Sequence, residues 1–457
     1  MSDVLLRNCE IVNADSQFFG SILMSDGKIQ AIVGPRDQPQ AATVIDVGGR
    51  PVIPGVIDTH VHLGVGPKSF AEDCLAESRS AAVTGVTTFM NYLLQMESYK
   101  PLIPQIEQDI AANSMVDMWL HAAIMSDEHL GEMVDYVEEF DISSFKFFMA
   151  YKGSEAMDFL RGVDDGLLYE ALNTLAKYPH VLPMVHAENI ELVLRGIDKV
   201  RATGRQDLAA WAEARPAIAE EEAQLRAWFL ARNAGSKLLV VHMSAGYTAA
   251  QLAEQRVNYP FLYGETCPQF LGLDDTMPLG GLGKCNPPVR DRRNAELLWQ
   301  ALENGSIDFV GSDHSTFSRE QKANGLWEAS PGLPSMPAIL PVLLSEGVNR
   351  GRLTLQQLVR VTSYNAARIF GMLPRKGRIQ VGADADLTVL DLTKTQRFTL
   401  EAVASGLDWS PYEGLTFTGW PVMTFLGGRL AASEGAIVDD AIRGQRLRAS
   451  ALSAPRP

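Results

Sequence analysis

The chain has 457 residues, of which 46% are hydrophobic, so it is long enough to bury a sizeable core and to divide into a main domain and a smaller one. Its formal net charge of −15, without a concentrated basic patch, argues against a nucleic acid or an anionic membrane as a partner. The four cysteines follow no disulfide or zinc-finger spacing, which favours reduced thiols in a cytoplasmic protein. The first residues lack the features of a signal peptide, and no apolar run is long enough to span a bilayer, so we expect neither secretion nor membrane insertion.

The two ends of the chain predict one small β domain. The first fifty residues alternate short apolar runs with turn signals, which is typical of antiparallel strands. The same pattern returns after residue 373. We therefore expect a β-sandwich domain built from residues 1–53 and 374–445, followed by a flexible tail over residues 446–457.

The middle of the chain alternates strand-like runs with amphipathic helical stretches, which is the pattern of a parallel α/β fold. The stretch around residues 188–230 is rich in Ala, Glu and Arg and predicts helices, and residues 355–370 have apolar residues at helical spacing. Eight candidate strands indicate a closed (β/α)8 barrel over residues 54–373. They lie at residues 52–62, 87–91, 116–121, 144–148, 181–186, 238–242, 261–265 and 307–313.

Several of these strands end in a residue that can bind a metal. The first ends in His60 and His62, which are two residues apart and so face the same side of a strand. The fifth, sixth and eighth strands end in His186, His242 and Asp313. The active site of a barrel is assembled at the carboxyl ends of its strands, and neutral imidazole is a preferred ligand of zinc and similar divalent ions. At any one of these five positions, a core histidine or a helix-capping aspartate is about as good an explanation as a metal ligand. A coincidence of such residues at all five positions is a poorer explanation than a metal site.

Lys146 lies inside the aromatic run FKFF of the fourth strand. A buried, unpaired ammonium group is unfavourable, so such a lysine reaches solvent, finds a carboxylate or loses its proton. A neutral amine can react with carbon dioxide to form a carbamate, an anionic oxygen ligand that could bridge two metals. A lysine paired with a nearby acid is the alternative.

Six longer motifs are spread over nearly the whole chain, namely PGVIDTHVH at 54–62, SFKFFMAYK at 144–152, HAEN at 186–189, GETCPQFL at 264–271, GSDH at 311–314 and KGRIQVGADAD at 376–386. Together they are highly specific, and the sequence resembles the cyclic amidohydrolases of the dihydropyrimidinase, hydantoinase and allantoinase group. The resemblance implies a barrel with a β-sandwich, a homo-oligomer (tetramer or dimer), and two divalent metal ions, usually zinc, with manganese or cobalt as alternatives.

The resemblance also assigns roles by motif position. Lys146 would be an N6-carboxylated lysine that binds both metals. The more buried metal would bind His60, His62 and Asp313, and the second metal His186 and His242. The metals would share a hydroxide that attacks the scissile amide, while Asp313 would move the proton to the leaving nitrogen. Tyr151 would donate a hydrogen bond to the oxyanion, although an aromatic residue at the barrel mouth without a catalytic role is the alternative.

The substrate-binding positions mix features of two branches of this group. Tyr151 favours the hydantoinases and dihydropyrimidinases, whereas residues 284–290 and 311–315 are more similar to allantoinases. Asn286 stands where the hydantoinase branch usually has Ser or Thr, and Glu328 stands in place of an Asn; both are candidate substrate-binding residues. The main prediction is hydrolysis of a 5-substituted hydantoin or a dihydropyrimidine, and the alternative is ring opening of allantoin.

A non-catalytic function is the other class to consider. Some relatives of dihydropyrimidinase have lost metal ligands and act as scaffold proteins. All six ligand positions are filled in this chain. The sequence therefore predicts a metal-dependent hydrolase of C–N bonds whose partner is a small cyclic amide.

Overall fold

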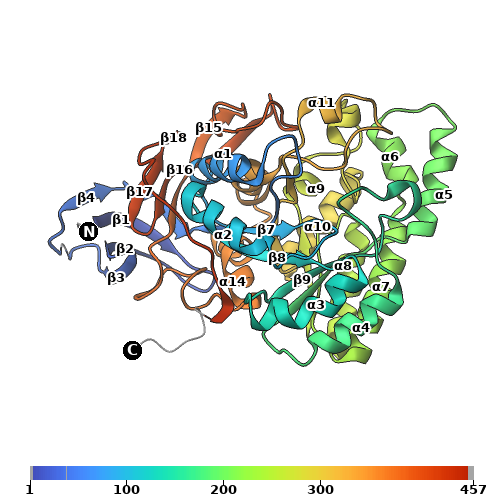
Figure 1. Ribbon diagram of the computed structural model, residues 1–457. Coiled ribbons are helices and arrows are strands. Elements are labelled where there is room, and N and C mark those ends of the chain that lie inside the picture. Colours follow the sequence, from blue (N-terminus) through green and yellow to red (C-terminus); the bar gives the residue numbers. More distant parts are fainter. Residues whose placement is uncertain (1–3, 38, 451–457) are drawn as a thin grey trace.

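Both units expected from the sequence are present in the computed structural model, which describes residues 4–37 and 39–450 (Figure 1). A parallel sheet surrounded by helices forms the larger part of the molecule. A second sheet combines the blue and red ends of the chain at the left of the view. These features confirm a (β/α)8 barrel with a small β domain. None of the described helices is long and apolar enough to cross a membrane.

The barrel strands follow one another in chain order, and each pairs in parallel with the next. Seven are continuous: β6 (Val56–His62), β7 (Val86–Leu93), β8 (Asp117–Ala123), β9 (Ser144–Phe148), β10 (Leu182–His186), β11 (Leu238–Val240) and β12 (Leu262–Thr266). The eighth is split into β13 (Phe309–Val310), which pairs with β12, and β14 (His314–Ser315), which pairs with β6. Because residues 311–313 join these pieces, the eighth strand closes the sheet and places Asp313 at the break.

Helices cover the outside of the barrel. The connections after β6 to β12 contain α1 (Phe70–Val83), α2 (Leu102–Asn113), α3 (Asp127–Glu138), α4 (Asp165–Leu175), α5 (Ile190–Arg201), α6 (Leu208–Ala214), α7 (Ala217–Ala234), α8 (Gly246–Asn258), α9 (Pro268–Gly272) and α10 (Arg292–Asn304). After β14 come α11 (Arg319–Lys322), α12 (Ile339–Val342), α13 (Leu355–Val359) and α14 (Asn365–Ile369). Helix α5 shows why these segments are helical. Asn189 accepts hydrogen bonds from the first turn, and the buried residues Ile190, Val193 and Ile197 recur at helical spacing.

The small domain is one nine-stranded sheet built from both chain ends. Its order is β18 (Ala436–Ile437), β17 (Arg429–Ser433), β16 (Thr416–Leu426), β15 (Leu387–Arg397), β5 (Pro51–Pro54), β1 (Val4–Val12), β2 (Gln17–Ser25) and β3 (Lys28–Val33), with β4 (Thr43–Asp46) paired to β1. The two ends meet where β5 pairs with β15, with Val52 opposite Val389. Both side chains are buried in the core of this domain, which fixes the register.

The strand expected over residues 52–62 is two strands in different sheets. The amide of Gly55 donates to the carbonyl of Asp386 at 2.8 Å, on the small-domain side, whereas the next amide, Val56, donates to Gly85 in the barrel at 3.1 Å. A Cβ atom on Gly55 would lie 2.1 Å from Thr87 Oγ1. Only glycine lets the chain pass this close to β7, so the change of sheet occurs here.

The expectation of a flexible tail is wrong for its first five residues. Leu447 is buried, and its amide donates to the carbonyl of Met118 at 2.7 Å. Arg446 pairs with Glu107 on α2, and Ser450 donates to Asp141. Residues 446–450 therefore pack against the barrel, because Leu447 adds to its apolar core. Residues 451–457 lie outside the described residues.

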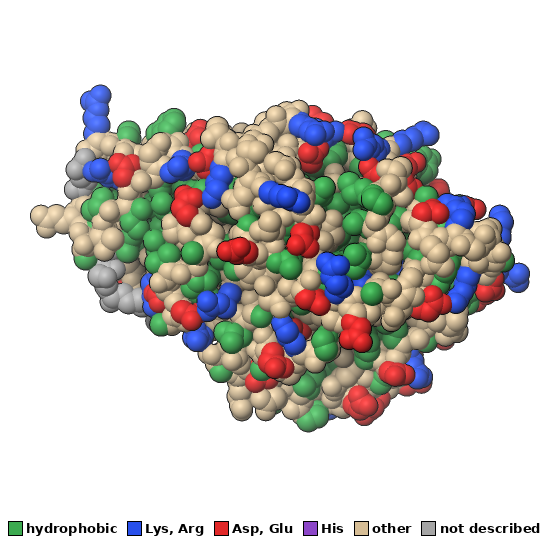
Figure 2. All heavy atoms as spheres, turned by 90° about the horizontal axis from the view of Figure 1, so that it is seen from above, with side chains coloured by type: hydrophobic (Ala, Val, Ile, Leu, Met, Phe, Trp, Pro, Cys, Tyr) green, Lys and Arg blue, Asp and Glu red, His purple; other side chains and the backbone are tan. Residues whose placement is uncertain are grey.

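The face of the molecule seen in Figure 2 carries both signs of charge, with acidic and basic side chains interspersed among apolar ones. Opposite charges also form ion pairs near the surface, such as Arg7–Asp46 at 2.9 Å and Lys394–Glu434 at 2.9 Å. Solvent and salt screen pairs of this kind, so the stability of the fold depends on its buried core.

Candidate active site

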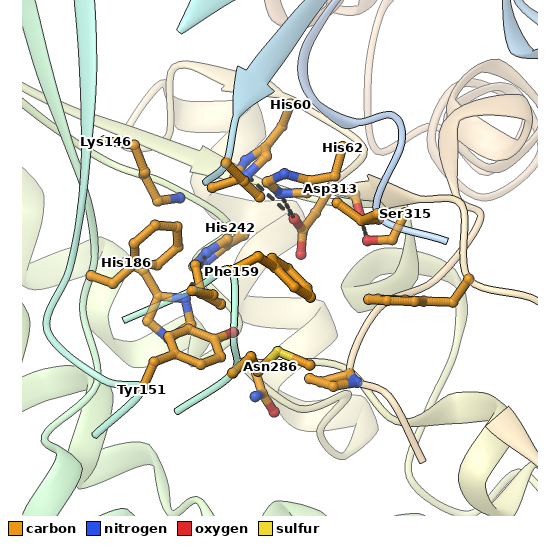
Figure 3. Close-up of a pocket in the computed structure, with 17 residues that line it drawn as sticks. His60, His62, Lys146, Tyr151, Phe159, His186, His242, Asn286, Asp313 and Ser315 are labelled. Atoms are coloured by element: carbon orange, nitrogen blue, oxygen red, sulfur yellow. Dashed lines mark hydrogen bonds and ion pairs between the residues drawn. The ribbon is translucent and has the colours of Figure 1, made fainter. Parts of the chain in front are cut away.

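A pocket opens at the carboxyl ends of the barrel strands, and all six residues predicted to bind metal line it (Figure 3). They come from β6, β9, β10, the segment after β11 and the break in the eighth strand. Apolar side chains form much of the remaining wall, among them Leu94, Phe159 and Phe317. The barrel therefore brings together the strand ends that the sequence singles out.

His60, His62 and Asp313 form the first group of donors. The Nε2 atoms of His60 and His62 lie 3.3 and 3.1 Å from Asp313 Oδ1. One donor atom from each of the three residues falls within 4.8 Å of the others, which is close enough for a single metal ion. Burial keeps the pKa of both histidines below the ordinary value, so the imidazoles are neutral and able to bind a metal.

His186 and His242 form the second group. His186 Nδ1 lies 3.0 Å from His242 Nε2, so the two nitrogens face each other. The two groups are neighbours, because the rings of His60 and His242 stack with their centroids 5.3 Å apart. The arrangement places two donor sets side by side at the bottom of one pocket.

Lys146 points toward these histidines from β9 (Figure 3). It is fully buried, and no described residue gives its Nζ atom a hydrogen bond. The amine instead lies 5.0 Å from the centre of the Tyr92 ring and 5.1 Å from that of Phe148. Burial lowers the pKa of this ammonium well below its usual range, against the attraction of Asp313 and Glu265. An unpartnered amine beside two sets of metal donors fits a site that is completed by further ligands.

The backbone at three pocket residues is strained. Tyr151, His242 and Asp313 have φ angles of 59°, 41° and 52°, in the left-handed region that non-glycine residues rarely adopt. The turn before Asp313 is fixed by Asp58, which accepts hydrogen bonds from the amide and hydroxyl of Ser312 at 2.8 and 2.5 Å. Strain of this kind persists where the surroundings enforce it, and it is concentrated at functional sites.

Two carboxylates that the sequence argument did not include orient the histidines. His60 donates from Nδ1 to Glu265 at 2.7 Å, and His186 donates from Nε2 to Glu188 at 2.7 Å. Each bond leaves the opposite ring nitrogen directed into the pocket, as in many metal-binding histidines. Glu265 ends the predicted seventh strand and Glu188 lies two residues after His186, so the strand-end argument could have found both.

Tyr151 and Asn286, two of the candidate substrate-binding residues, both line the pocket. The Tyr151 ring lies 5.1 Å from the ring of His186. Burial raises the pKa of its hydroxyl, and a hydrogen bond from Asn286 opposes this only in part. The phenol therefore stays protonated at neutral pH and is able to donate a hydrogen bond.

The structure does not bring the Glu328 side chain into the pocket, which leaves the backbone of this segment as the part that could contact a substrate. The Glu328 side chain is 49% exposed and pairs with Arg201 at the surface. Trp327 beside it is buried, and Pro331, three residues further on, is the part of this segment that lines the pocket.

Comparison with known proteins places this geometry in context. Residues 284–431 match the family described as "Amidohydrolase family". The chain is 34% identical to the L-hydantoinase of Paenarthrobacter aurescens, with 96% of each chain covered, and 35% identical to the D-hydantoinase of Geobacillus stearothermophilus, with 97% of this chain and 96% of that one covered. It is 31% identical to the allantoinase of Deinococcus radiodurans, over 98% and 99% of the two chains. The crystal structure of dihydropyrimidinase from Brevibacillus agri superposes with a TM-score of 0.90 at 31% identity, covering 99% of this chain and 100% of that one.

Proposed function

Because the chain belongs to the cyclic amidohydrolases of the amidohydrolase family, with the hydantoinases, dihydropyrimidinases and allantoinases, we propose that it opens the ring of a 5-substituted hydantoin or a dihydropyrimidine with the help of two divalent metal ions. It is a hydrolase of cyclic amides. The observation that carries the finer proposal is the meeting of four histidines, Asp313 and an unpartnered Lys146 at the bottom of one pocket.

We assign the metals, which we expect to be zinc, to the two donor groups. His60, His62 and Asp313 would hold one ion, His186 and His242 the other, and an N6-carboxylated Lys146 both. Carboxylation would convert a buried amine without a partner into an anionic oxygen ligand, with loss of a proton from nitrogen as the N–C bond forms. When bound, the ions would supply Lewis acidity, which lowers the pKa of water and polarises a carbonyl group.

Asp313 and Tyr151 are the residues that we assign to proton and charge transfer. One oxygen of the Asp313 carboxylate faces the two histidines and the other points into the pocket (Figure 3). This carboxylate can accept a proton from the attacking water and deliver it to the ring nitrogen as the C–N bond breaks. The Tyr151 hydroxyl can donate to the carbonyl oxygen, on which negative charge develops.

The apolar wall of the pocket favours a substrate with an apolar ring substituent. Leu94, Met157, Phe159, Leu160 and Phe317 line the pocket beyond the donor groups. Burying an apolar substituent against them removes water from both surfaces, at about 25 cal/mol per Å². We therefore expect 5-aryl or 5-alkyl hydantoins to be better substrates than unsubstituted rings.

The test is ring-opening activity of protein loaded with zinc, or with manganese, in bicarbonate buffer. The substrates are 5-substituted hydantoins, dihydrouracil, a simple cyclic imide and allantoin. Preference for the hydantoins or dihydrouracil supports the proposal. Preference for allantoin would instead favour the second candidate, to which Asn286 and the 31% identity with an allantoinase point. Two bound metals with turnover of none of these compounds would contradict both candidates.

A further inference from the structure

Arg215 lies where two segments of the active site meet. It is fully buried in the link between α6 and α7, with its guanidinium group 5.3 Å from the Trp211 ring. Its Nε and Nη2 atoms donate to the two oxygens of Glu188 at 3.0 and 2.6 Å, and Nη1 donates to Glu155. One side chain thus joins the segment after β10, which contains Glu188, to the segment after β9, which contains Glu155.

The bond to Glu188 leads to the second donor group. Glu188 is fully buried, and the oxygen that accepts from Arg215 Nη2 also accepts from His186 Nε2 at 2.7 Å. A hydrogen on Nε2 leaves the lone pair of His186 on Nδ1, the atom that faces His242. Arg215 therefore holds the Glu188 carboxylate in place, and that carboxylate sets the tautomer and orientation of His186.

The bond to Glu155 leads to Tyr151. Glu155 ends the 3₁₀ helix η1 (Gly153–Glu155), which begins two residues after Tyr151. Tyr151 has the left-handed backbone described above, and its carbonyl accepts a hydrogen bond from Gly162 at 3.0 Å. Contacts beyond the turn itself are required to keep Tyr151 in this strained conformation. The ion pair between Glu155 and Arg215 provides such a contact inside the protein.

We infer that Arg215 is a positioning residue that holds Tyr151 and His186 in one fixed relation, through Glu155 and Glu188 respectively. The inference rests on the proposed function, because it requires Tyr151 to act on the substrate. Its two branches control different properties. The Glu188 branch sets the affinity of the second metal position, and the Glu155 branch sets turnover through Tyr151.

A double-mutant cycle tests the Glu155 branch. Glu155→Gln should lower kcat about tenfold, the size expected when a catalytic group is displaced slightly, with no change in metal content. The same substitution in a Tyr151→Phe background should change kcat less than about twofold, because the group through which it acts is gone. Equal losses in both backgrounds, or no loss from Glu155→Gln alone, would overturn this branch.

Zinc affinity tests the Glu188 branch without an activity assay. In titrations against a competing chelator, Glu188→Gln should weaken the second zinc site about 10- to 100-fold, as for other partners of metal-binding histidines. Arg215→Lys keeps the charge but loses the planar fork, so it should show both defects, and its thermal unfolding reports whether it is folded. Unchanged zinc affinity in Glu188→Gln would refute the branch.

Glu213→Gln is the matched control. It makes the same chemical change in an exposed carboxylate of α6 that pairs with Arg205, so it should leave kcat and zinc affinity unchanged. Inactivity of the wild-type chain on every cyclic amide would refute the proposed function. The zinc titration would still decide the Glu188 branch in that case.

Discussion

Two fully buried lysines have surroundings so different that replacement by methionine should change stability in opposite directions. Lys146 Nζ has no hydrogen-bond partner among the described residues and lies 5.0 and 5.1 Å from the ring centres of Tyr92 and Phe148. Lys322 Nζ, in contrast, donates to the carbonyls of Lys284, Ser330 and Gly332 at 2.7, 2.6 and 2.9 Å. In the metal-free protein, the ammonium group of Lys146 therefore destabilises the fold, whereas that of Lys322 stabilises it through its three hydrogen bonds.

The size of the effect follows from these contacts. A buried polar group without a partner costs about 1–3 kcal/mol, so Lys146→Met should raise the free energy of unfolding of the metal-free protein by about that amount. At about 2.1 cal/mol/K per residue, the unfolding entropy of 457 residues is about 1 kcal/mol/K, and Tm should rise by about 1–3 °C. Lys322→Met loses three hydrogen bonds and strands three carbonyls, so it should lower Tm by about 3 °C or more.

The gain from Lys146→Met should depend on pH. Burial lowers the pKa of Lys146 from its ordinary value of 10.5, so between the folded and unfolded pKa values the unfolded chain binds a proton that the folded chain does not. The stability of the wild type therefore rises with pH through that interval. The gain in the free energy of unfolding from Lys146→Met is therefore largest at pH values below the pKa of Lys146 in the folded protein. It is lost as the pH approaches 10.5.

The assay combines thermal unfolding of chelator-treated protein with metal analysis and turnover after reloading in bicarbonate. Lys146→Met should melt above the wild type when metal-free, bind fewer than two metals and hydrolyse nothing. Retention of two metals with full turnover would refute the role of Lys146 as a bridging ligand. A lower metal-free Tm would refute the argument that its ammonium is destabilising, and Lys322→Met controls for the loss of any buried lysine.

Two further predictions concern the pocket. Tyr151→Phe should lower kcat by about 10²- to 10³-fold with metal content unchanged, because we propose the protonated hydroxyl as the donor to the developing oxyanion. An unaffected kcat in steady-state assays would remove Tyr151 from the mechanism. Glu328→Gln should change kcat/KM less than about twofold and the free energy of unfolding by less than about 0.5 kcal/mol, because the carboxylate pairs with Arg201 at the surface. A tenfold loss of kcat/KM would show that Glu328 reaches the substrate.

The sequence predicts the barrel and the meeting of the six donors because both follow from short-range rules. Alternation along a strand puts His60 and His62 on one face, and parallel strands in chain order bring their carboxyl ends together. The change of sheet at Gly55 is not visible in the sequence, because the residues on both sides are apolar and buried. The direction of the Glu328 side chain is likewise not visible in the sequence, because it depends on the tertiary packing around Trp327.

What the sequence does not show is how the predicted side chains are held in place. His60 and His186 are each fixed from behind by a buried carboxylate, and Arg215 in turn fixes one of those carboxylates. Lys146 Nζ has no such partner on any described residue, and neither does Nδ1 of His62 or of His242. The pocket also includes three residues with strained backbone. Buried side chains that hold some donors from behind while others have no partner are the arrangement expected of a metal site, and a metal that binds only the folded state stabilises it by an amount that grows with the logarithm of its affinity. Zinc in bicarbonate should therefore raise the Tm of the wild type more than that of Lys146→Met.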